Sequence, residues 1–185
     1  MALSSIPARL FGQADTRPNE PAYYVRGPSE WQPTNWATYA NNVRQVARAL
    51  TAAQVVPGNV ICILGNNRPE WCEMDVGAMA IGAIPAGIYQ TCSPEEIAYI
   101  LNHSEAPIIL VENKSQWEKI NAIRAELPHL KRIVLMRDSG AIQDDIAQSW
   151  DDFLASGESV PAGDIDKAVK NLSPDAPATF IYTSG

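Results

Sequence analysis

The stretch Val60-Ile61-Cys62-Ile63-Leu64-Gly65-Asn66-Asn67-Arg68-Pro69 decides the fold. Its first five residues form a short, continuous apolar run, which is typical of a strand covered on both faces of a sheet. The Gly-Asn-Asn that follows is a turn signal, and a proline two residues later suits the first turn of a helix. The stretch therefore predicts a buried strand, a tight turn and a helix.

The same alternation continues on both sides of this stretch. Apolar or β-branched runs predict strands at 22–25, 31–36, 60–64, 84–89, 107–111, 132–136 and 178–182. Periodic apolar residues and capping signals predict helices from Thr38, the expected N-cap, to Leu50, 69–81, from Ser93 past Leu101, 115–127 and about 150–154. Short strands that alternate with helices predict an α/β fold, a mostly parallel sheet with flanking helices. Such sheets bind ligands at the carboxyl ends of their strands.

Length and charge narrow the classes of function. The 185 residues are enough for one domain with a sizeable core, so residues 1–185 are treated as one unit. The net charge of −7 argues against nucleic acid as a partner, because proteins that bind nucleic acid usually present a basic face. No apolar run approaches the roughly 20 residues of a membrane-spanning helix.

The N-terminus and the cysteines give information on the cellular compartment of the protein. The first residues lack a charged segment followed by an apolar core, so no secretory signal is predicted. Cys62, Cys72 and Cys92 are odd in number and have no metal-ligand spacing, which favours reduced, structural cysteines in a cytoplasmic protein. Peripheral attachment to the inner face of a membrane and homodimer formation both stay open.

The sequence ends in Phe180-Ile181-Tyr182-Thr183-Ser184-Gly185, where an apolar run gives way to two hydroxyl residues and a glycine. Small residues after a buried strand let backbone N–H groups approach an anion, and hydroxyls add donors. We therefore expect Thr183, Ser184 and Gly185 to bind phosphate. The alternative is an ordinary turn, because Ser, Thr and Gly are common turn residues.

Other conspicuous side chains are given structural interpretations. His103 lies near a predicted helix end and suits a structural role. Arg68 suits a cap or an ion pair with Glu70 or Asp75.

Two aromatic residues, Trp71 and Tyr89, are expected to pack in the core or between domains. Four aspartates are interpreted as a solvated acidic face, with no metal site among them, because no further ligand spacing supports one: Asp144, Asp145, Asp151 and Asp152.

Several motifs together resemble those of adenylate-forming enzymes, the superfamily of acyl-CoA synthetases, luciferases and adenylation domains. Tyr182-Thr183-Ser184-Gly185 is similar to the start of that family's phosphate-binding loop. Further matches follow in the family's order, with Asn59 where aspartate is usual: Trp36-Ala37-Thr38-Tyr39, 57–64, 65–71 and 82–89. Residues 91–106 most resemble the long-chain fatty acyl-CoA synthetase branch, and the resemblance runs from about Leu10 to Gly185.

The resemblance implies a two-step ligase that uses ATP, Mg²⁺ and, as a substrate, coenzyme A. A fatty acid attacks the α-phosphate of ATP to give acyl-adenylate and pyrophosphate, and the thiol of coenzyme A then takes the acyl group. Thr183, Ser184 and Gly185 would contact the ATP phosphates. The family's loop lysine and metal-coordinating acid would lie downstream, so we expect a fragment cut inside the phosphate-binding loop, with no catalytic residue of its own. Another acid-activating enzyme, such as an amino-acid adenylation domain, and a non-catalytic folding or interaction module are the alternatives.

Overall fold

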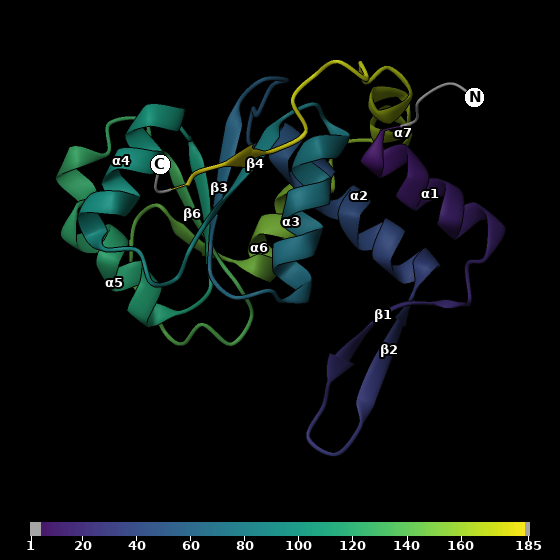
Figure 1. Ribbon diagram of the computed structural model, residues 1–185, viewed down its shortest axis with the longest axis horizontal. Coiled ribbons are helices and arrows are strands. Elements are labelled where there is room, and N and C mark those ends of the chain that lie inside the picture. Colours follow the sequence, from purple (N-terminus) through teal and green to yellow (C-terminus); the bar gives the residue numbers. More distant parts are fainter. Residues whose placement is uncertain (1–4, 184–185) are drawn as a thin grey trace.

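The computed structural model describes residues 5–183 and shows a six-stranded sheet between two layers of helices (Figure 1). Every neighbouring pair of strands is parallel, so the predicted α/β fold with a parallel sheet is confirmed. From one edge to the other the sheet contains β7 (Ala147–Ser149), β6 (Arg132–Leu135), β5 (Ile108–Val111), β3 (Val60–Leu64), β4 (Ile84–Ile88) and β8 (Phe180–Ile181).

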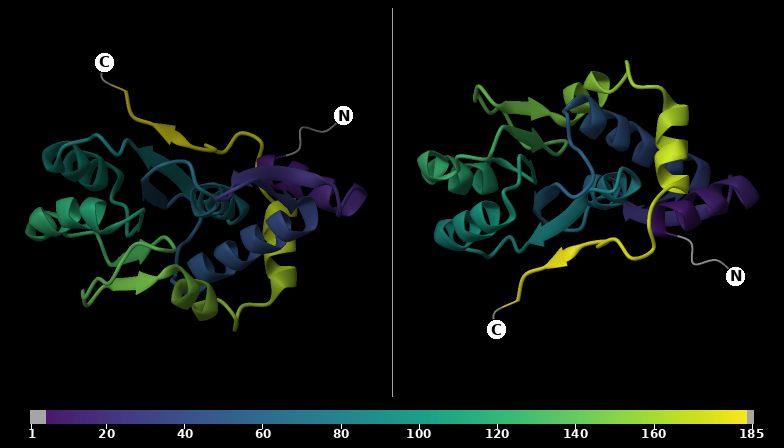
Figure 2. Two further views of the ribbon diagram at one scale, coloured as in Figure 1. Left: turned by 90° about the horizontal axis from the view of Figure 1, so that it is seen from below. Right: turned by 90° about the horizontal axis from the view of Figure 1, so that it is seen from above.

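The helices divide into two layers, one on each face of the sheet (Figure 2). One face carries α4 (Pro94–Ser104) and α5 (Lys114–Ala122). The other face carries the larger layer, namely α1 (Ile6–Thr16), α2 (Trp36–Ala52), α3 (Pro69–Ala80), α6 (Trp150–Ser156) and α7 (Ala162–Lys170).

Strand β3 lies inside the sheet and shows why its sequence is apolar throughout. Ile61 and Ile63 belong to the core beneath the larger helical layer. Val60, Cys62 and Leu64 belong to the core beneath α4 and α5. Alternate side chains of a strand point to opposite faces, so a strand covered on both faces needs apolar residues at every position. The prediction from 60–64 is confirmed.

A separate antiparallel hairpin projects from the body beside α2 (Figure 1). It consists of β1 (Pro21–Arg26) and β2 (Trp31–Asn35), close to the two strands expected there. The prediction that Thr38 caps α2 is wrong. The helix begins at Trp36, and the side chain of Asn35 accepts a hydrogen bond from the backbone N–H of Thr38 at 2.8 Å. Asparagine is a better N-cap than threonine.

Three elements were not expected from the sequence, namely α1, α7 and β7. The segment that contains β7 is polar and lacks a clear period, so it carries no local strand signal. The expected helix 115–127 is in fact α5 followed by a 3-10 turn at Arg124–Glu126.

The expectation of a buried final strand is also wrong. β8 has two residues, pairs only with β4, and forms the edge of the sheet within residues 5–183. The side chain of Ile181 is 77% exposed. An apolar run leads to burial on both faces only where other elements cover both faces of the strand.

The sequence predicts reduced, structural cysteines and contains no apolar run long enough for a membrane-spanning helix. Cys62, Cys72 and Cys92 are free thiols, and burial raises the pKa of the Cys62 thiol to about 12. Within residues 5–183, no helix combines the length and the apolar character needed to cross a membrane.

Candidate functional site

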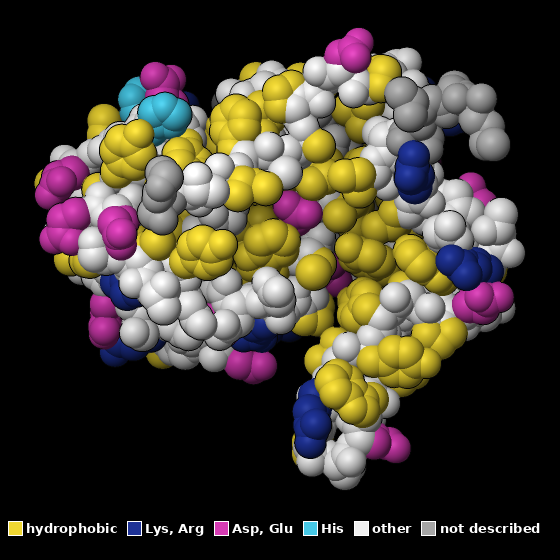
Figure 3. Space-filling view, in the orientation of Figure 1, with side chains coloured by type: hydrophobic (Ala, Val, Ile, Leu, Met, Phe, Trp, Pro, Cys, Tyr) yellow, Lys and Arg dark blue, Asp and Glu magenta, His cyan; other side chains and the backbone are white. Residues whose placement is uncertain are grey.

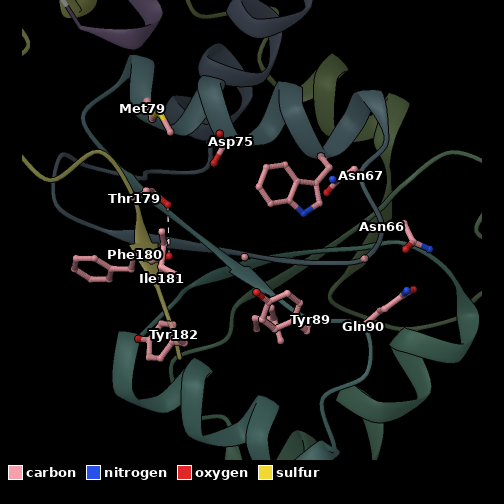
Figure 4. A pocket seen from close by; sticks show the side chains of 14 residues that line it. Asn66, Asn67, Asp75, Met79, Tyr89, Gln90, Thr179, Phe180, Ile181 and Tyr182 are labelled. Atoms are coloured by element: carbon pink, nitrogen blue, oxygen red, sulfur yellow. Dashed lines mark hydrogen bonds between the residues drawn. The ribbon is translucent and has the colours of Figure 1, made fainter. Parts of the chain in front are cut away.

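A pocket of about 690 Å³ opens at the carboxyl ends of β3, β4 and β8 (Figure 4). The connection after β3 leads to α3 on one face of the sheet, whereas the connection after β4 leads to α4 on the other. Chains that leave neighbouring strands toward opposite faces open a crevice, the usual ligand site of such sheets. The lining comprises Gly65–Asn67, Trp71, Asp75, Met79, Gly87–Gln90 and Thr179–Tyr182.

The turn after β3 is held by a buried carboxylate. Glu112, which directly follows β5, accepts hydrogen bonds from the backbone N–H of Asn66 at 2.9 Å and from its side-chain amide at 3.3 Å. A Cβ atom at Gly65 would lie 2.6 Å from Cβ of Glu112, so this approach requires glycine. The side-chain amide of Asn66 is thereby fixed at the rim of the pocket. Sequence reasoning missed Glu112, although its place directly after an apolar strand is a signal for this edge.

The turn after β4 is anchored from α5. The ammonium group of Lys119 donates hydrogen bonds to the carbonyls of Gln90 at 2.7 Å and Cys92 at 3.0 Å. The side-chain amide of Gln116 also donates to the carbonyl of Gln90, at 3.2 Å. These contacts fix the backbone next to Tyr89, whose side chain is 73% exposed. The prediction that Tyr89 packs in the core is therefore wrong, and the alternative that it packs between domains stays a prediction.

Helix α3 supplies the wall of the pocket opposite β8 (Figure 4). Trp71 lies over Gly87, where an added Cβ atom would come within 3.2 Å of the indole ring. Trp71 is half-buried and packs on the core, as expected. Asp75 contributes a carboxylate, and burial raises its pKa to about 6. Among residues 5–183, neither lysine nor arginine lines the pocket, so Asp75 supplies the charged side chain of its lining.

Of the three predicted phosphate-binding residues, the structure places one. Thr183 is exposed just beyond β8 and lines a neighbouring pocket of about 660 Å³ on the α4 side. Ser184 and Gly185 lie outside the described residues. Figure 3 shows that hydrophobic side chains predominate at the centre of this face. Tyr182, the residue before Thr183, forms a 2.9 Å hydrogen bond with Nδ1 of His103, so the structural role expected of His103 has a defined partner.

Two further charged residues that the sequence singled out lie outside the lining of the pocket. Arg68 forms the expected ion pair with Glu70, at 3.3 Å. The interpretation of a solvated acidic face fails for Asp144, whose side chain is 8% exposed and pairs with Arg124. Asp144 also accepts a hydrogen bond from the indole N–H of Trp117 at 2.8 Å, so it organises a buried network.

Comparisons with known proteins place the chain in a family. A family model described as AMP-binding enzyme matches residues 10–185. A long-chain-fatty-acid–CoA ligase of Xenopus laevis, ACSBG2, is 33% identical over 156 residues, which cover 84% of this chain and 21% of the relative. The corresponding ACSBG1 of Rattus norvegicus is 30% identical over 178 residues, covering 96% and 25%. The chain thus spans about a fifth to a quarter of the length of these relatives.

Solved structures agree on the fold. The anthranilate CoA ligase AuaEII, solved with anthranoyl-AMP, superimposes with a TM-score of 0.71 at 25% identity, covering 84% of this chain and 29% of that one. Coronafacic acid ligase from Pectobacterium brasiliense gives a TM-score of 0.78 at 15% identity, covering 95% and 33%, which supports the fold alone. With the family model matching nearly the whole sequence, this chain belongs to the AMP-binding enzyme family.

Proposed function

We propose that this chain is the amino-terminal part of the large domain of an ATP-dependent long-chain fatty acyl-CoA synthetase. The reaction joins a fatty acid and ATP to give acyl-adenylate and pyrophosphate, and then transfers the acyl group to the thiol of coenzyme A. The observation that carries the proposal is the pocket at the carboxyl ends of β3, β4 and β8, whose lining includes Tyr182, the residue that precedes Thr183 in the sequence. Relatives named as long-chain-fatty-acid–CoA ligases support the choice of acid.

Thr183 and the residues that line the pocket have defined tasks under this proposal. The hydroxyl of Thr183 donates to a phosphate oxygen, and the fixed amide of Asn66 donates to a polar group of the ligand at the opposite rim. Donors that are held in place before the reaction stabilise developing charge without a cost of reorganisation. Trp71, Met79 and Ile88 exclude water from the side of the pocket beneath α3.

The pocket does not fit a resident Mg²⁺ ion. Asp75 is the single carboxylate in its lining, and residues 5–183 contain no group of three or more potential metal-ligating side chains. Octahedral Mg²⁺ is commonly held by one or two carboxylates together with substrate phosphates and waters. Mg²⁺ would therefore depend on ATP and on residues beyond this chain.

The same lining supports the proposal that the 185 residues act as part of a larger enzyme. A polyphosphate needs cationic partners, and none of the described residues that line the pocket is a lysine or an arginine. We propose that the phosphate-binding loop continues past Gly185, and that this continuation supplies the lysine that the family resemblance implies. The chain alone is then inactive.

The test is fatty-acid-dependent exchange of labelled pyrophosphate into ATP. The reading frame is extended past Gly185, and the full-length protein is compared with residues 1–185. Palmitate, anthranilate and a mixture of amino acids serve as acids, because the anthranilate ligase AuaEII is a structural neighbour with the same fold. Exchange by the full-length protein with palmitate alone supports the proposal. Exchange with anthranilate or amino acids alone identifies another acid-activating enzyme, and a stop codon directly after Gly185 contradicts the proposal.

A further inference from the structure

Strand β8 makes few contacts with the rest of the protein, although we propose that it leads into the phosphate-binding loop. It pairs with β4 at two positions, and its side chains are largely exposed. Just before it, the hydroxyl of Thr179 donates a hydrogen bond to the carbonyl of Pro85 at 2.9 Å. This contact fixes the start of β8. It does not determine the direction of the chain beyond Ile181, which therefore depends on other contacts.

A second contact lies on the far side of β8, at Tyr182. Its hydroxyl is 2.9 Å from Nδ1 of His103, and the two rings meet edge to face with centroids 5.7 Å apart. His103 is itself stacked on Tyr99, one helical turn earlier in α4, at 5.7 Å and 20°. Burial raises the pKa of Tyr182, so its hydroxyl keeps its proton at neutral pH and remains available for this hydrogen bond.

The helix that carries His103 is a firm support. Ser93 and Glu96 form a reciprocal capping box at the start of α4, with hydrogen bonds of 2.7 and 3.3 Å. Ile97 and Leu101 are buried in the core beneath the helix. An exposed imidazole on such a helix can fix a neighbouring side chain because its own backbone does not move with the loop.

We propose that His103 is a positioning residue. Through Tyr182 it sets the direction in which the chain leaves β8, and thereby the place of Thr183 at the ATP phosphates. This inference rests on the proposed function. It adds to the phosphate site a residue of α4, His103, which lies 79 positions before Tyr182 in the sequence.

The first measurement is made on the 185-residue chain and does not need activity. The chain contains two histidines, His103 and His129, so the ¹⁵N ring signals of His103 are assigned by their loss in His103→Phe. Tyr182→Phe should shift the Nδ1 signal of His103 and leave the signals of His129 unchanged. Unchanged His103 signals would show that the hydrogen bond does not form in solution, and would overturn the inference.

The second measurement is a double-mutant cycle in the full-length enzyme. His103→Phe and Tyr182→Phe each keep an aromatic ring and remove the hydrogen bond. Each should raise the KM for ATP about fivefold, as expected for one net hydrogen bond, with the KM for fatty acid and the melting temperature unchanged. The double variant should resemble either single variant, because both lose the same interaction. His103→Asn, which places an amide near the position of Nδ1, should recover part of the ATP affinity, whereas His129→Gln should behave as the wild type.

The outcomes separate the two proposals. A wild-type enzyme that activates fatty acid, together with phenylalanine variants of unchanged KM for ATP, contradicts the role of His103 alone. Additive effects in the double variant, or equal changes in both KM values, also contradict it, because they indicate general disturbance of the fold. A wild-type enzyme without acid-dependent exchange removes the proposed function and this role of His103 with it.

Discussion

Gly77 of α3 faces Val46 of α2 so closely that a methyl group added to Gly77 would lie 2.5 Å from Cγ1 of Val46. Both residues are fully enclosed where the two helices cross beneath the sheet. Gly77→Ala should therefore lower the free energy of unfolding by about 1–3 kcal/mol, the usual effect of overpacking. Urea unfolding followed by circular dichroism measures the change.

Gly163 of α7 provides the matched control, because no atom lies within 4 Å of a Cβ added there. Gly163→Ala should be neutral or stabilising by up to about 1 kcal/mol, since alanine favours helix more than glycine does. Adding Val46→Ala should restore part of the stability lost in Gly77→Ala. If Gly77→Ala and Gly163→Ala had the same effect, the close contact would not limit the packing.

Asp75 makes stability depend on pH, because burial raises its pKa from 3.8 to about 6. A raised folded-state pKa means that the stabilising contribution is complete below about pH 4 and is lost as the pH rises through about 6. Asp75→Asn should therefore stabilise the protein at pH 7.5 and have little effect at pH 4. A two-unit shift corresponds to about 3 kcal/mol, and partial exposure reduces the expected gain to about 1–2 kcal/mol.

Urea unfolding at both pH values measures the effect of Asp75→Asn. Asp15→Asn is the control, since Asp15 is an exposed carboxylate at the end of α1. A gain that is equal at pH 4 and pH 7.5 would contradict desolvation as the cause.

Asp144 should show the opposite dependence on pH. Burial by itself raises its pKa, but hydrogen bonds from Arg124, the backbone N–H of Ile146 and Trp117 outweigh burial and lower it. A lowered folded-state pKa gives stability that is present above pH 4 and is lost as the pH falls. Asp144→Ala should cost about 2–4 kcal/mol at pH 7, because Arg124 loses its partner, and the difference should shrink in acid. Asp145→Ala, at an exposed neighbour, should stay within about 0.5 kcal/mol of the wild type.

The positions of β3, β5 and β6 along the sequence were predictable, because these strands lie inside the sheet, where burial on both faces requires an apolar run. The helix at α4 was predictable from local signals, since its serine cap, proline and glutamate act within one turn. β7 was not predictable, because its pairing with β6 depends on a long-range contact that leaves no local period.

For the site, the sequence predicted which edge of the sheet it occupies but not the contacts between its residues. The carboxyl ends of the parallel strands predicted the edge at which a pocket opens, and the structure brings Asn66 and Tyr89 to that edge. The binding of phosphate by Thr183 stays a prediction. Glu112 and His103 could not be assigned their partners from sequence, because each contacts a segment more than 40 residues away. Long-range hydrogen bonds of this kind are decided by the register of the sheet.

The last prediction concerns Thr183 and Ser184 in the full-length enzyme. Loss of one donor to developing negative charge costs roughly 3 kcal/mol, or about a hundredfold in rate. Thr183→Ala and Ser184→Ala should therefore each slow acyl-adenylate formation by up to about a hundredfold, as measured by rapid quench in a single turnover. Thr183 is exposed at the end of an edge strand, so its substitution should leave the melting temperature unchanged.

The control for this prediction is Thr179→Ser, which keeps the hydroxyl bound to the carbonyl of Pro85 and should leave the rate of adenylation unchanged. A slow Thr183→Ala variant with a normal melting temperature identifies a contact made in the reaction, because a turn residue that served only folding would lower stability first. Wild-type rates in both Thr183→Ala and Ser184→Ala would remove these residues from the phosphate site. The sequence from Thr183 to Gly185 would then be an ordinary turn, and the binding of ATP would have to depend on other parts of the pocket.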